Sequence, residues 1–188
     1  MKTSKEQTFF GEIDPSSVLN VVSEEFANTI GLVMPFTLEE PLFTDSVHLG
    51  VPGADEGIRV AFKLGFRTPA GARSGFIQVP LESALVFSGG LQTLPADEVR
   101  AMSSRKAPNK QDKVAIHEGG KIVGSAVESR LQFEFNADFE VIFAGCQGMV
   151  PGALPSLPGY GGESFIVRRQ QARFPRYDPF ELLIAVPI

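Results

Sequence analysis

Two pairs of polar residues with helical spacing are the strongest candidates for chemistry in this sequence. Glu25 and Asn28 are three residues apart in one segment, and Glu118 and Lys121 are three residues apart in another. On a helix, residues at this spacing are neighbours on the surface. A Glu-x-x-Asn pair is frequent by chance, and Glu118 with Lys121 is also typical of a surface ion pair worth about 0.2–0.5 kcal/mol. Both pairs are therefore candidates for binding or catalysis, with a purely structural alternative.

The absence of other motifs excludes several enzyme classes. The sequence contains no G-x-S-x-G, P-loop, C-x-x-C or H-E-x-x-H motif. Lys121 follows Gly119 and Gly120, as at the end of a P-loop. The first glycine and the final Ser or Thr of that motif are missing, which excludes nucleotide binding there. One cysteine and two histidines are too few for a His/Cys zinc site. We expect no bound metal and no cofactor.

Length and composition predict one globular domain over residues 1–188. The chain is long enough to bury a core without disulfides, and its one cysteine, Cys146, indicates a reducing compartment. The N-terminus lacks the apolar region of a signal peptide, and no apolar run approaches the ~18–20 residues that span a bilayer. We therefore expect a cytoplasmic protein without membrane insertion. The net charge of −5 and the pI near 5.1 argue against nucleic acid as a partner.

Charge is unevenly distributed along the chain. Residues 1–60 carry ten acidic and three basic side chains, whereas residues 101–130 carry six basic and three acidic ones. The basic segment would attract an acidic partner, although two solvated faces explain the same distribution.

The elements that must position the two pairs are an N-terminal helix and a central helix. Asp14 is a good N-cap, Pro15 suits the first helical position, and apolar residues then recur at helical spacing, which predicts a helix over 15–31. A second apolar stripe predicts a helix over about 112–131. Three glycines within it indicate close packing against a neighbouring element: Gly119, Gly120 and Gly124.

The composition of the remaining segments is typical of strands separated by Pro/Gly turns. A further helix is predicted over 80–94 with a short helical start at 95–98, and the Gly/Pro-rich residues 145–162 predict a long surface loop. Strands are predicted at 46–51, 58–67, 74–79, 132–135, 139–143, 164–172 and 180–187. This order predicts an α+β fold, with a mostly antiparallel sheet and helices packed on it. The two halves are similar enough to indicate an internal pseudo-repeat.

Residues 114–125, VAIHEGGKIVGS, resemble the signature helix of the CheC/CheX/FliY family of chemotaxis (CheY-phosphate) phosphatases. In that family an Ala-Ile pair precedes a Ser/Asp-x-x-x-Glu-x-x-Asn motif, and small residues follow. Residues 83–95 are similar to the family's helix with a Leu-Pro ending, the helix at 15–31 to its first helix, and residues 180–188 to its terminal strand. The resemblance covers most of the chain and implies a CheX/CheC-like fold.

The resemblance also implies a partner and a reaction. It implies a protein that docks on a phosphorylated CheY-like receiver domain and hydrolyses its aspartyl phosphate, with the metal held by the receiver. In the family the glutamate pairs with a receiver lysine, and the asparagine orients the attacking water. Glu118 matches the glutamate, whereas Lys121 stands at the asparagine position and Val114 at the Ser/Asp position. Lysine is a donor only, so it cannot accept a hydrogen bond from water as asparagine does.

The N-terminal helix carries a second copy of the pair. Some family members carry one pair on each of two pseudo-symmetric helices, and here Glu25 and Asn28 keep the Glu-x-x-Asn step, with Val21 at the Ser/Asp position. The resemblance therefore implies that Glu25 and Asn28 are the catalytic pair. Glu118 and Lys121 then form a docking site or a degenerate catalytic site.

Two alternatives stay open. One is a non-catalytic interaction module of the same fold, which forms a homodimer or binds a chemotaxis or flagellar partner. The substitutions at the two motif positions 114 and 121 favour this module, and the intact Glu25–Asn28 pair favours the phosphatase. The other is an unrelated small-molecule enzyme with a pocket under residues 145–162.

Overall fold

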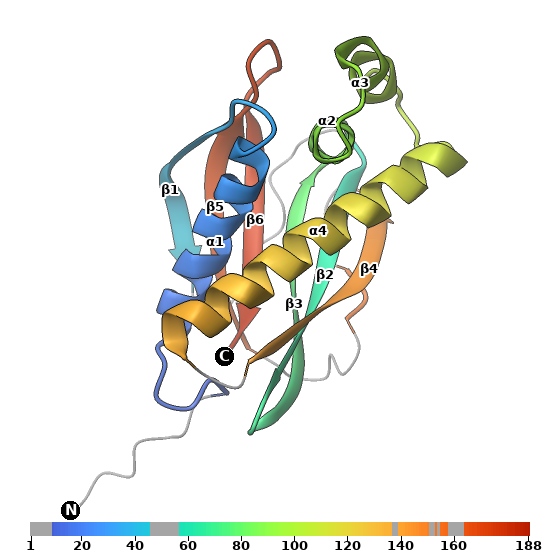
Figure 1. Cartoon of the computed structure of the whole chain (residues 1–188). Helices are drawn as coiled ribbons and strands as arrows, with labels where there is room; N and C mark the ends of the chain where they lie inside the picture. Colours follow the sequence, from blue (N-terminus) through green and yellow to red (C-terminus); the bar gives the residue numbers. More distant parts are fainter. Residues whose placement is uncertain (1–8, 46–56, 137–138, 151–152, 154, 158–163) are drawn as a thin grey trace, which may run out of the picture.

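The structure, a computed structural model, describes residues 9–45, 57–136, 139–150, 153, 155–157 and 164–188 (Figure 1). Four helices and six strands are formed in these segments. In chain order they are α1 (Pro15–Gly31), β1 (Thr37–Asp45), β2 (Arg59–Thr68), β3 (Gly71–Pro80), α2 (Leu81–Leu91), α3 (Ala96–Ser103), α4 (Lys110–Phe135), β4 (Glu140–Met149), β5 (Phe165–Arg173) and β6 (Phe180–Pro187).

The strands form one sheet in the order β1-β5-β6-β3-β2-β4, and every neighbouring pair is antiparallel. The predicted α+β fold with an antiparallel sheet is therefore confirmed. The order is also symmetric: exchanging β1, β2 and β3 for β4, β5 and β6 gives the same order read backwards. Each half thus contributes a hairpin to the middle of the sheet and one strand to an edge, which fits the expected pseudo-repeat.

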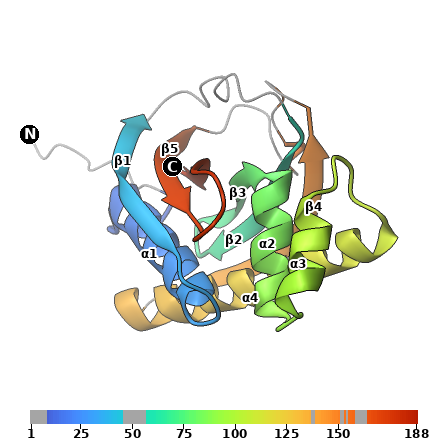
Figure 2. The same ribbon diagram turned by 90° about the horizontal axis from the view of Figure 1, so that it is seen from above.

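The long helices lie on one side of the curved sheet, as the view from above shows (Figure 2). α1 packs on β5 and β6, α2 on β2 and β3, and α4 on β4, and both α1 and α2 contact α4. The main core fills the space between these helices and the sheet. In it the ring of Phe87 lies 5.7 Å from that of Phe26 and 5.2 Å from that of Phe62, measured between centroids. A smaller apolar cluster, which includes Phe76, Phe165 and Leu183, lies on the opposite face of the sheet.

Helix α1 has the predicted bounds, and its start follows the predicted chemistry. The side chain of Asp14 accepts a hydrogen bond from the backbone N–H of Ser16 at 3.0 Å, and Pro15 is the first helical residue. Helix α4 is longer than predicted, and the strand predicted at 132–135 is wrong. Residues 132–135 are the last turn of α4, because the buried Leu131 and the partly buried Phe135 continue its apolar stripe.

The structure differs from the prediction at three further places, in β4, β1 and α2. Residues 145–149, predicted as part of a loop, belong to β4, and residues 146–149 pair with β2. Residues 37–45 form β1, which was not predicted, and the strand predicted at 46–51 lies outside the described residues. Helix α2 ends at Leu91, three residues before the predicted end.

Candidate functional site

The orientation of α1 on the sheet is fixed by a buried chain of hydrogen bonds. Ser23 Oγ donates to Gln170 Oε1 at 2.6 Å, and Gln170 Nε2 donates to the carbonyl of Glu39 at 3.0 Å. Because Ser23 and Gln170 are both buried, losing either partner would leave an unsatisfied polar group in the interior. The chain therefore ties α1 to β5 and β1, and it determines which residues of α1 face the solvent.

On α1 the predicted catalytic pair is only partly accessible. Asn28 is exposed, whereas Glu25 is half-buried and its Oε1 accepts a hydrogen bond from Thr29 Oγ1 at 3.4 Å. Val21, at the position where the family motif has Ser or Asp, is only 6% exposed and lies in the core. Helix α1 thus exposes the amide of Asn28 and part of the carboxylate of Glu25 to solvent, but Val21 is too buried to contact a partner.

Helix α4 lies close to its neighbours because of its glycines. A Cβ atom at Gly119 would lie 2.7 Å from Ser88 Oγ of α2. A Cβ atom at Gly120 would lie 2.5 Å from ring carbons of Phe143 on β4, and one at Gly124 would lie 3.1 Å from the Cβ of the same phenylalanine. The close packing predicted from the three glycines is confirmed, and it directs the opposite face of α4 outward.

The outward face of α4 carries the second predicted pair. Lys121 Nζ and Glu118 Oε1 lie 2.8 Å apart, and both side chains are about half exposed. The hydrogen bond from Lys121 holds the pKa of Glu118 below its ordinary value, because the ammonium group stabilises the carboxylate. Val114, one turn before Glu118, is 56% exposed. All three motif positions of α4 are therefore accessible, although two of them carry substituted residues.

The two pairs lie on neighbouring helices rather than in one cluster. Helices α1 and α4 contact each other on the same side of the sheet (Figures 1 and 2). Among the described residues, no hydrogen bond or ion pair joins Glu25 or Asn28 to Glu118 or Lys121. The structure thus contains two candidate surfaces that face outward, and each can be tested by its own substitutions.

The described part of the chain contains neither a candidate metal site nor a candidate membrane span. No group of three or more His, Cys, Asp or Glu side chains there could hold a metal ion. None of the helices in the same segments is long and apolar enough to cross a membrane. His117 packs its ring against that of Phe143 at 5.0 Å, and His48 lies outside the described residues.

The structure contains a groove between α4 and β4, most of whose lining was not predicted from the sequence. It has a volume of about 890 Å³ and an apolar floor that includes Ile58 and Leu81. Its polar lining includes Lys110, Lys113 and the thiol of Cys146, whose pKa is raised by burial. Residues from four separate segments form it, around positions 58–60, 81, 107–118 and 146–150, so no spacing in the sequence could reveal it. Four of its lining residues fall within 145–162, where the small-molecule alternative expects a pocket: Cys146, Gly148, Met149 and Val150. His117 and Glu118 also line it.

Comparisons with known proteins identify the fold. No protein-family model matches the sequence, and a search of curated proteins gives no match. Among solved structures, FliY from Thermotoga maritima has a TM-score of 0.63 at 9% identity and covers 94% of this chain and 92% of its own. The chemotaxis protein CheX from Desulfovibrio desulfuricans has a TM-score of 0.58 at 11% identity, with coverage of 92% and 99%. A chemotactic CheC-like protein from Shewanella oneidensis has a TM-score of 0.56 at 12% identity, with coverage of 91% and 97%. This chain therefore has the fold of FliY, CheX and CheC-like proteins, as its sequence resemblance predicts.

Proposed function

We propose that this protein docks on a phosphorylated CheY-like receiver domain and that α1 hydrolyses the receiver's aspartyl phosphate. The observation that carries the proposal is the exposed amide of Asn28, one turn from Glu25 on the outward face of α1. The fold shared with chemotaxis proteins, and the resemblance of the motif region to their phosphatases, support the same assignment.

The chemistry needs an amide rather than a titrating group. The side-chain oxygen of Asn28 can accept a hydrogen bond from water while its NH₂ group donates to a phosphoryl oxygen. When the amide holds the water in line with the phosphorus, the attack of water becomes effectively a unimolecular step. This positioning does not depend on a side chain with a perturbed pKa. The carboxylate of Glu25 would pair with a cation of the receiver beside the phosphorylation site. The metal ion that the reaction uses belongs to the receiver.

The decay of phosphate from a panel of phosphorylated CheY-type receivers tests this assignment. We expect the protein to accelerate decay, and the Asn28→Ala variant to lose roughly 100-fold of that acceleration because the water is no longer positioned. Asn20→Ala is the matched control: Asn20 is also an exposed asparagine of α1, and its amide oxygen accepts a hydrogen bond from Arg168. Full acceleration by Asn28→Ala would remove α1 from the mechanism.

A non-catalytic interaction module is the second candidate, and α4 favours it. Lys121 is a donor only and is already engaged by Glu118 at 2.8 Å, so it cannot orient water as an asparagine would. The outward face of α4 also exposes apolar side chains, with Val114 at 56% and Phe133 at 79%. Such side chains are typical of a contact surface, either for a receiver or for a second copy of the chain.

The Lys121→Asn variant distinguishes the two candidates. It restores the Glu-x-x-Asn step on a helix where positions 114, 118 and 121 are all accessible. If the native chain binds receivers without accelerating decay and Lys121→Asn gains acceleration, the protein is an interaction module with a degenerate catalytic site. If the native chain is active and Lys121→Asn adds nothing, catalysis belongs to α1.

A further inference from the structure

The groove between α4 and β4 combines an apolar floor with a basic rim. Its floor includes Ile58, Val60 and Leu81, and its volume of about 890 Å³ lies in the usual range for ligand sites. Lys110 and Lys113, both exposed, line it from the first turns of α4. This rim belongs to the segment 101–130, whose six basic and three acidic residues give it a positive balance in an otherwise acidic chain.

Acidic residues near the groove do not cancel this charge. Glu118 lines the groove, but its carboxylate is bound by Lys121 at 2.8 Å. Asp112, on the first turn of α4, is buried and paired with Arg105. The two rim lysines therefore remain available for an anionic group, and an occupant must carry both acidic and apolar groups.

Two features favour an extended chain as the occupant. Val114 on α4 and Val150 at the end of β4 line the groove and are 56% and 67% exposed, which leaves apolar surface on both sides of it. β4 is also an edge of the sheet: among the described residues, it pairs with β2 on one side and with no strand on the other. The backbone groups of an edge strand are a template for a further strand.

We propose that this groove binds an acidic peptide segment of a partner protein, which adds as a strand to the edge of β4. The peptide side chains on the α4 side of the sheet enter the groove. The apolar ones among them point toward Ile58 and Leu81, and the acidic ones lie beside Lys110 and Lys113. Because successive side chains of a strand point to opposite faces, both sets must occupy every second residue of the peptide. This site is separate from the Glu25–Asn28 pair and needs neither a receiver nor a phosphate.

The probe is a fluorescein-labelled peptide of about ten residues, the upper length of a common strand, with Glu and Val in turn at every second residue and Thr at the residues between them. We expect the full chain to bind it in an anisotropy titration and to ignore the peptide that carries Lys in place of Glu. Lys110→Glu together with Lys113→Glu should weaken binding by at least about tenfold. These variants keep α4 intact, because carboxylates are favourable in the first turn of a helix.

Matched controls separate the groove from general charge. Arg100→Glu with Lys106→Glu makes the same change in net charge at exposed residues outside the groove, and we expect binding within about twofold of the native chain at physiological salt. On binding, hydrogen exchange of the β4 backbone amides should slow. N-methylation of the peptide amides that face β4, which are every second amide, should abolish binding.

Absence of binding overturns the proposal, as does equal weakening by both double variants. Binding of decanoate but not of the peptide would assign the groove to small amphipathic anions and also overturn it.

Discussion

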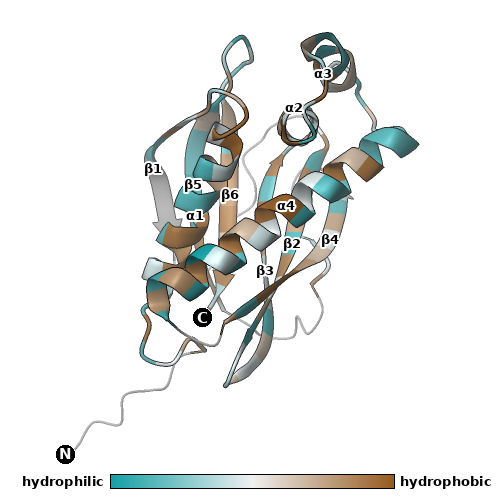
Figure 3. Ribbon diagram, in the orientation of Figure 1, coloured by the Kyte–Doolittle hydropathy of each residue, from teal (hydrophilic) through white to brown (hydrophobic). Residues whose placement is uncertain are grey.

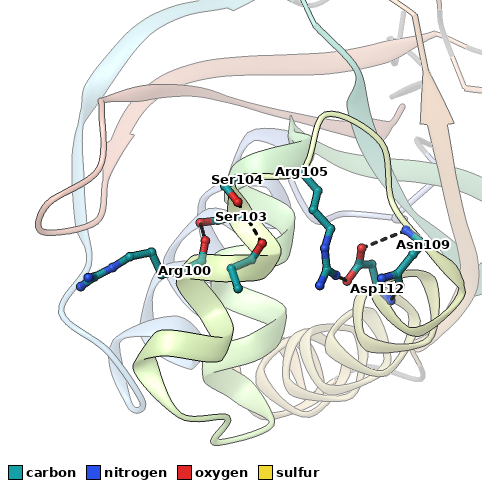
Figure 4. A network of polar contacts seen from close by, with 7 residues as sticks. Arg100, Ser103, Ser104, Arg105, Asn109 and Asp112 are labelled. Atoms are coloured by element: carbon teal, nitrogen blue, oxygen red, sulfur yellow. Dashed lines mark hydrogen bonds and ion pairs between the residues drawn. The ribbon is translucent and has the colours of Figure 1, made fainter.

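The connection between α3 and α4 is held by one buried carboxylate, and its removal gives the sharpest test of the structure. Asp112 is 1% exposed, and its two oxygens have different partners (Figure 4). Oδ1 accepts a hydrogen bond from Arg105, and Oδ2 accepts one from the backbone N–H of Asn109 at 2.9 Å. In return the side chain of Asn109 accepts a hydrogen bond from the N–H of Asp112 at 2.8 Å, which completes a capping box at the start of α4. We therefore predict that Asp112→Ala is destabilising.

The size of the loss follows from these contacts. Asp112→Ala removes one of the two hydrogen bonds of the capping box while Asn109 remains the N-cap, so its cost lies at the low end of the about 0.5–2 kcal/mol for a lost cap. A hydrogen bond to a charged group contributes about 1.5–3 kcal/mol. The loss of about 3–5 kcal/mol for breaking a fully buried ion pair does not apply. The side chain of Arg105 is 37% exposed, so water can solvate the guanidinium once Asp112 is gone. We expect the free energy of unfolding to fall by about 2–3 kcal/mol, summing the cap and the discounted ion pair.

Urea unfolding monitored by circular dichroism measures this change. With m values of about 1–3 kcal/mol/M, the midpoint should fall by about 0.7–3 M while m stays constant. Asp97→Ala is the control, because Asp97 is an exposed acidic residue in the first turn of α3 and should contribute less than about 1 kcal/mol. A loss below about 1 kcal/mol in Asp112→Ala would refute the assigned role of the buried carboxylate.

Two further predictions concern the outward and inward faces of α4. Gly119→Ala should be destabilising by about 1–3 kcal/mol in the same assay, because the new Cβ would lie 2.7 Å from Ser88 Oγ and force α2 and α4 apart. Gly31→Ala, at a helical glycine with nothing within 4 Å, should be neutral or stabilising, and the reverse order of the two variants would contradict the packing. A carbon-13 NMR titration should find the pKa of Glu118 below its ordinary value, so its pairing with Lys121 persists above the ordinary carboxyl pKa and disappears as the pH falls through the lowered one. Lys121→Met should return that pKa to the ordinary range, and an unchanged value in the variant would rule out the ion pair as its cause.

Local chemistry made α1 predictable, whereas two strand segments depended on partners that the sequence does not identify. The cap at Asp14 and the proline after it act within one turn, so the start of α1 follows from the sequence alone. The segment that forms β1 contains Glu39, Glu40 and Pro41, and its pairing with β5 shifts register on both sides of the proline. An edge strand tolerates such residues. Residues 145–149 likewise extend β4 only because β2 lies beside them.

The candidate site shows the same division between local and long-range information. The spacing of Glu118 and Lys121 was enough to predict their ion pair. The burial of Val21 was not predictable from its spacing, because α1 packs against both the sheet and α4 and therefore buries more than one stripe. The groove depends on α4 crossing beside β4. Only the three-dimensional arrangement brings Lys113 and Val150 to opposite sides of one cavity.

Hydropathy along α4 follows from its two environments. Figure 3 shows hydrophobic and hydrophilic stretches alternating along this helix. Its inward residues, such as Val123 and Val127, are fully buried, and its outward residues mix charges with exposed apolar groups such as Ile122. The inward face is constrained by packing against α2 and β4, whereas the outward face is not. Substitutions that change which partner the helix binds can therefore accumulate on the outward face without loss of the fold.

The symmetric strand order has a kinetic consequence. β6 is synthesised after the other five strands, yet it lies in the middle of the sheet between β5 and β3. β1 pairs with β5, which brings Thr37 beside Arg173 near the other end of the described chain. Contacts between such distant residues close large loops, which slows folding. During synthesis, the edge of β3 in the β2–β3 hairpin therefore stays unpaired until β6 has been made. A holding chaperone should increase the folded yield of this chain by protecting that edge until β6 arrives.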